Sequence, residues 1–79
     1  MSRTQMQSLV HMANQIAVNL EHGPGGEHEA AERVASHLRR FWSRGMREQL
    51  IEYAAGDSAG LNPVSALAAE ILAADAVIP

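Results

Sequence analysis

The chain is 79 residues long, carries a net charge of -3 and contains neither Cys nor Lys. This length allows one domain with a small core, and the absence of Cys excludes disulfides, thiolate metal sites and cysteine nucleophiles. Its acidity argues against a general attraction to nucleic acid, and it has neither a signal peptide nor an apolar run of membrane-spanning length, so we expect a cytoplasmic protein with no membrane partner.

An amphipathic pattern predicts a first helix at about residues 4–21. At about 100° per residue, its apolar side chains gather in one arc. They are Met6, Leu9, Met12, Ala13, Ile16, Ala17 and Leu20. Residues 23–26, Gly-Pro-Gly-Gly, end this helix because Pro restricts the residue before it and Gly accepts left-handed backbone. Asn14 flanks the arc, where its amide can face solvent or bind a backbone group of a loop or a partner.

A second helix is predicted at about residues 27–42. Glu27 and Glu29 occupy its first turn, where acidic groups complement the helix dipole. The predicted buried arc consists of Ala30, Ala31, Val34, Ala35, Leu38, Phe41 and Trp42. On the opposite side, Glu29 and Arg33 are spaced as an ordinary surface ion pair.

Two more helices are predicted, at about residues 44–55 and 63–76. Ser43 can cap the first of them, although a kinked continuation of the preceding helix is an alternative. Asn62 followed by Pro63 is a strong start signal for the second, because Pro needs no donor at the first helical position. The fold class is therefore all-α: a single domain over residues 1–79 with three to four short helices, of which the first two form an antiparallel hairpin.

Catalytic and metal-binding patterns are missing from this sequence. No His pair has the helical spacing of a metal site, and no nucleophile elbow, phosphate loop or dinucleotide motif occurs. So short a chain has little room to enclose a substrate pocket. We therefore expect no catalytic residue, no metal and no cofactor on this chain.

The stretch from His37 to Arg47 concentrates the aromatic and cationic side chains. It holds the only Phe, the only Trp and four of the six basic residues. Such groups dominate protein–protein hot spots because they give large desolvated contacts. The candidate partner-binding residues are Arg39, Arg40, Phe41, Trp42, Arg44, Met46 and Arg47, together with Asn14.

Most of these residues also have an ordinary structural interpretation. Phe41 and Trp42 continue the apolar arc, so we expect both to be at least partly buried, with the Trp edge able to reach a partner. Met46 is suited to filling the core, and Arg39 and Arg40 are typical of a solvated helix end. Only the combination of these residues indicates a binding surface.

Arg47 has the least ordinary position. It falls on the apolar side of its helix, with Leu50, Ile51 and Ala54, and Arg44 lies on the same flank. Its charge is expected either to reach solvent along the side-chain stem or to meet an acid supplied by another protein.

Two motifs occur in order along the chain. The first is LVHMANQIA at residues 9–17, and the second is HLRRFW at residues 37–42, followed by Met46 and Arg47. Together they resemble the small delta subunit of the soluble NAD-dependent, molybdenum-containing formate dehydrogenases. The resemblance covers about residues 7–53, and the helix at 61–79 is similar to the variable Ala-rich tail of that family.

One short segment departs from the family pattern. Ser43-Arg44-Gly45 stands where the family usually has Asp-Pro-Arg. Ser43 can still cap a helix, but the rigid Pro start is lost and the first Arg lies one place earlier.

The resemblance implies a non-catalytic accessory subunit of a cytoplasmic complex that oxidises formate and passes electrons to NAD. Its expected partners are the catalytic alpha subunit and the other subunits, which would carry the molybdopterin, iron–sulfur clusters, FMN and NAD. The expected role is to support assembly or stability by docking through the Arg39–Arg47 region. The alternative is a small helical nucleic-acid-binding or regulatory protein that uses the same segment, which the net acidity disfavours.

Overall fold

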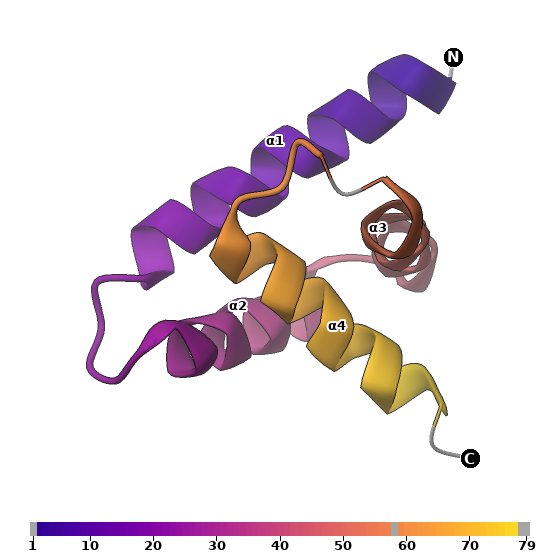
Figure 1. The fold of residues 1–79 in the computed structure, drawn as a ribbon. Coiled ribbons are helices and arrows are strands. Elements are labelled where there is room, and N and C mark those ends of the chain that lie inside the picture. The colour runs from indigo at the N-terminus through magenta and orange to yellow at the C-terminus, as the bar shows by residue number, and fades with distance from the viewer. Residues whose placement is uncertain (1, 58, 78–79) are drawn as a thin grey trace.

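A computed structural model describes residues 2–57 and 59–77, which form four helices (Figure 1). They are α1 (Ser2–Leu20), α2 (Glu27–Phe41), α3 (Arg44–Gly56) and α4 (Pro63–Val77). No strand occurs among these residues, so the all-α prediction is confirmed. No helix in the described part is both long and apolar enough to span a bilayer.

The helix packing centres on α2 and α4. Figure 1 shows α4 crossing α2, and these two helices make the most extensive contact in the fold. α1 makes smaller contacts with each of the other three helices. The predicted antiparallel hairpin of the first two helices is therefore not confirmed as the organising unit.

Small side chains line the surfaces where the helices meet. Within the described residues, the buried core consists of Leu9, Ala13, Ala17, Ala30, Ala31, Val34, Ala35, Leu38, Trp42, Leu50, Val64, Ala68, Ala69 and Leu72. Because the Ala side chain is short, helices that meet through Ala pack with their backbones close together. Trp42 is the one large aromatic side chain of this core.

Two residues of the predicted apolar arcs are exposed to solvent. Phe41 is 68% exposed, so its predicted burial is wrong, and Met12 is 41% exposed although it lies in the predicted arc of the first helix. α1 packs through the narrow row of Leu9, Ala13 and Ala17, which leaves Met12 at its edge. α2 ends at Phe41, and Trp42, whose backbone is extended, takes the inward position instead.

Both predicted N-caps are present. The Ser43 hydroxyl accepts a hydrogen bond from the Met46 N–H at 3.2 Å, and the Asn62 side-chain oxygen accepts one from the Ser65 N–H at 2.8 Å. The extended backbone at Trp42 and Ser43 separates α3 from α2, which excludes the kinked-continuation alternative.

Arg33 has a role that differs from the predicted surface pair with Glu29. Its Nε and Nη2 donate to the Leu20 carbonyl at 3.0 and 2.9 Å, and its Nη1 donates to the Pro24 carbonyl at 3.0 Å. The last carbonyls of a helix have no partner within the helix, so they attract a cationic donor. Arg33 thus caps α1 from α2 and ties the intervening loop to both.

We expect Arg33→Met to lower the free energy of unfolding by about 1–2 kcal/mol, because the carbonyls of Leu20 and Pro24 lose a charged donor. Urea denaturation followed by circular dichroism measures this change. Arg44→Met is the matched control, since Arg44 makes only an exposed pair within α3, and it should cost less than about 0.5 kcal/mol. Equal losses in both variants would contradict the capping role of Arg33.

Candidate functional site

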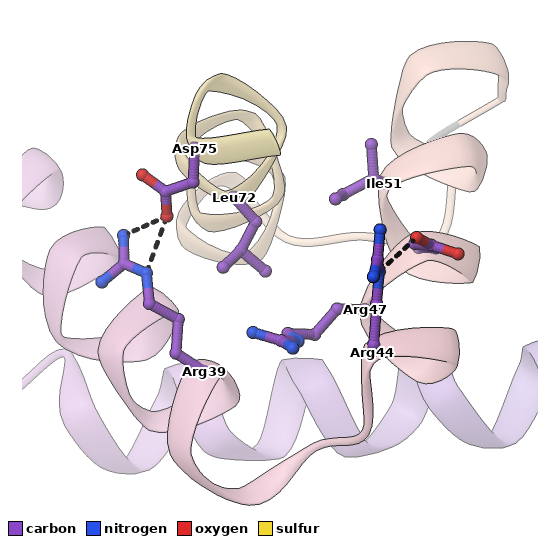
Figure 2. Close-up of a pocket in the computed structure, with 7 residues that line it drawn as sticks. Arg39, Arg44, Arg47, Ile51, Leu72 and Asp75 are labelled. Atoms are coloured by element: carbon purple, nitrogen blue, oxygen red, sulfur yellow. Dashed lines mark hydrogen bonds and ion pairs between the residues drawn. The ribbon is translucent and has the colours of Figure 1, made fainter. Parts of the chain in front are cut away.

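An arginine-lined pocket forms where the end of α2, the first turns of α3 and the last turns of α4 meet (Figure 2). Its volume is about 370 Å³. The lining residues are Arg39, Arg44, Arg47, Glu48, Ile51, Leu72 and Asp75. The pocket thus combines three cations and two carboxylates with apolar side chains on α3 and α4.

Two of the three arginines are already paired. Arg39 donates from Nε and Nη2 to the same oxygen of Asp75, at 2.7 and 2.6 Å, which joins α2 to α4. Arg44 pairs with Glu48 one turn further along α3, at 3.1 Å, and its side chain is 86% exposed. Both pairs are open to water, so they contribute little to stability but neutralise both cations.

Arg47 is the exception. Its Nε is buried and finds no hydrogen-bond partner among the described residues. Figure 2 shows the Arg47 side chain extending from α3 into the space between Arg39 and Leu72. A buried donor without a partner costs about 1–3 kcal/mol, more for a charged group. Arg47 therefore lies on the apolar side of α3, as its sequence position indicates, and its buried Nε lowers the stability of the free chain.

Phe41 lies on the outer surface at the end of α2. The His37 ring lies 4.7 Å from the Phe41 ring, centroid to centroid, and the Arg40 guanidinium carbon lies 5.8 Å from the Phe41 centroid. Such an exposed aromatic ring flanked by a cation is typical of binding hot spots.

The remaining candidates are engaged within the fold. Trp42 is only 7% exposed, which leaves little surface for another molecule, and Met46 is partly buried against the core. Asn14 binds the loop before α4: its Nδ2 donates to the Gly60 carbonyl at 2.8 Å, and its Oδ1 accepts from the Asn62 N–H at 3.0 Å. The loop alternative for Asn14 is therefore the one observed.

Four pocket residues were absent from the predicted set. They are Glu48, Ile51, Leu72 and Asp75. The spacing of Arg44 and Glu48 along one helix is a readable signal for a pair. Nothing local indicates that Asp75 meets Arg39, because the two residues lie 36 positions apart and meet only through the packing of α4 on α2.

Within the described residues, no three metal-binding side chains of His, Asp or Glu lie close enough together to hold an ion. The site offers guanidinium donors, an exposed aromatic ring and apolar walls. These are groups for recognising another molecule.

We expect Asn14→Ala to lower the free energy of unfolding by about 1–2 kcal/mol, because two hydrogen bonds that hold the loop before α4 are lost. Thermal and urea unfolding of the purified chain measure the effect. The control is Gln15→Ala, an exposed neighbour, with an expected change within about 0.5 kcal/mol. An Asn14→Ala variant as stable as this control would contradict the loop-holding role.

Comparison with known protein families identifies a family for this chain. The family model described as NADH-dependent formate dehydrogenase delta subunit FdsD matches residues 8–69, which include most of α1, all of α2 and α3, and part of α4. No curated protein and no solved structure matches the chain. The matched span includes both sequence motifs and all three pocket arginines, and covers well over half of the chain. The chain belongs to the delta subunit family of NADH-dependent formate dehydrogenase, FdsD.

Proposed function

We propose that this chain is a non-catalytic accessory subunit that docks on the large catalytic subunit of a cytoplasmic formate dehydrogenase and supports assembly or stability of the complex. Membership of the delta subunit family supports the assignment of this chain to a formate dehydrogenase complex, because the family is described as a subunit of that enzyme. We place the docking surface at the segment Arg39–Arg47, because the exposed ring of Phe41 and the uncompensated cation of Arg47 both lie within these nine residues.

The observation that carries the proposal is the exposure of Phe41. Burying a large apolar side chain stabilises a small domain, and an aromatic ring that stays in water does not contribute this hydrophobic free energy. In this chain the ring stays outside, although the core next to it accepts Trp42. A partner surface that covers Phe41 would recover the burial, and Arg40 and His37 beside the ring would supply polar contacts at its rim.

The accessory role follows from the chemistry of the chain. Iron–sulfur clusters need thiolate ligands, and this chain has no Cys. We therefore assign the iron–sulfur clusters to the partner subunits, and the resemblance to the family assigns molybdopterin, FMN and NAD to them as well. Formate oxidation then takes place outside this chain, which acts on the complex and not on the substrate.

The pairing of the arginines disfavours the nucleic-acid alternative. Arg39 and Arg44 are engaged by Asp75 and Glu48, so, within the described part of the chain, only two of the four arginines in the segment keep an uncompensated charge for a phosphate backbone. The net charge of -3 adds to this disadvantage.

We expect Phe41→Ser to weaken the association of the tagged chain with the catalytic subunit by about tenfold or more, since hot-spot side chains contribute about 2 kcal/mol or more. Its free energy of unfolding should change by less than about 0.5 kcal/mol, because the ring is exposed. Co-purification and biolayer interferometry measure association, and urea denaturation measures stability.

Val18→Ser is the matched control, because Val18 is an apolar residue with 44% exposure on α1, outside the Arg39–Arg47 segment. It should leave association unchanged. If Phe41→Ser binds as tightly as this control, this surface is not the docking surface. If the unaltered chain fails to associate with any formate dehydrogenase subunit, the proposed function is wrong.

A further inference from the structure

We propose that the pocket around Arg47 receives one carboxylate side chain, Asp or Glu, from the partner subunit. The inference rests on the proposed function for the identity of the partner, and it adds the chemistry of the contact. The carboxylate would bind the guanidinium of Arg47 and lie against Ile51 and Leu72. The Arg39–Asp75 and Arg44–Glu48 pairs would stay in place on either side.

The charge of the pocket fits a single carboxylate. Three arginines and two carboxylates line it, so one positive charge is uncompensated. The two ion pairs account for Arg39 and Arg44, and the free charge is therefore that of Arg47. One carboxylate neutralises it, whereas a phosphate group would bring excess negative charge next to Asp75 and Glu48.

The geometry of Arg47 fits the same occupant. Its Nε is already buried and lacks an acceptor among the described residues, so this donor is held out of water before any ligand arrives. An incoming carboxylate can reach the outer edge of the guanidinium, where the two Nη atoms present parallel donors that match its two oxygens. The contact would compensate the charge of a guanidinium whose inner edge the fold has already removed from water, so less of the contact energy is spent on desolvation.

The apolar walls select against a free small anion. Ile51 and Leu72 form part of the lining, and the volume of about 370 Å³ exceeds what a carboxylate group alone needs. An amino-acid side chain brings methylene groups and neighbouring residues that can cover these walls. A simple ion would leave them exposed to water, so the pocket suits an acidic side chain on a protein surface.

This arrangement has an unusual consequence for stability. A residue kept for the fold stabilises the free chain, whereas Arg47 leaves a buried donor unsatisfied there. Replacing such a group by an apolar residue of similar length is commonly neutral or stabilising. A binding role therefore predicts that stability and association change in opposite directions when Arg47 is replaced.

The experiment uses Arg47→Met in the full chain and measures both quantities. We expect the melting temperature of the isolated variant to equal or exceed that of the unaltered chain, and its association with the catalytic subunit to weaken about tenfold or more. Val18→Ser is again the control, because Val18 is exposed on α1 and lies outside both the pocket and the Arg39–Arg47 segment. Its association should equal that of the unaltered chain.

A charge-swap experiment tests the occupant. Arg47→Glu should abolish association, and a set of Asp→Lys and Glu→Lys variants of the catalytic subunit should contain one that restores it by about tenfold or more. Restoration by one position identifies the acid, and restoration by none overturns the inference.

Other outcomes separate this inference from the proposed function. If the unaltered chain associates with the catalytic subunit and Arg47→Met associates equally well, the carboxylate contact is wrong while the docking proposal stands. If Arg47→Met melts at a lower temperature and loses association to the same extent, Arg47 is a structural residue and the inference is wrong. If the unaltered chain binds duplex DNA at low salt and Arg47→Met does not, the pocket binds phosphate and both proposals fail.

Discussion

The two extended residues between α2 and α3 determine where the functional side chains of this chain lie. Trp42 and Ser43 both have extended backbone, so α2 stops at Phe41 and α3 starts afresh at Arg44. Because of this break, Trp42 turns into the core while Phe41 remains outside. The capped start of α3 then places Arg44 and Arg47 beside α4. Burial of the indole, exposure of the phenyl ring and the position of the arginine pocket all follow from one short junction.

Local signals were enough to locate the helices. The Gly-Pro-Gly-Gly run, the Ser43 cap and the Asn62-Pro63 start are each a property of a few adjacent residues, and the four helices begin and end close to them. Packing was harder to foresee. The Ala-rich α4 has apolar residues on every side, so its sequence does not indicate which helix it will join, and the structure places it mainly on α2.

The candidate site was predictable in part for the same reason. The position of Arg47 on the apolar side of α3 could be read from helical spacing alone, and the structure places its Nε in a buried position. The same spacing put both Phe41 and Trp42 in the core, because it treated both as helical, whereas α2 ends at Phe41 and the extended Trp42 alone takes the inward position. Arg33 and Asp75 contact groups on other helices, and such contacts appear only once the tertiary packing is known.

The ion pair between Arg39 and Asp75 joins the part of the chain that the family model matches to the part that it does not match. Arg39 lies within the span that the family model matches, whereas Asp75 lies beyond its end at residue 69. All three arginines and Glu48 thus come from the matched span, while Asp75 and Leu72 come from the tail beyond it. A substitution at Asp75 alone would therefore release the Arg39 guanidinium from its partner and add a second free cation to the pocket, without altering any residue of the matched span.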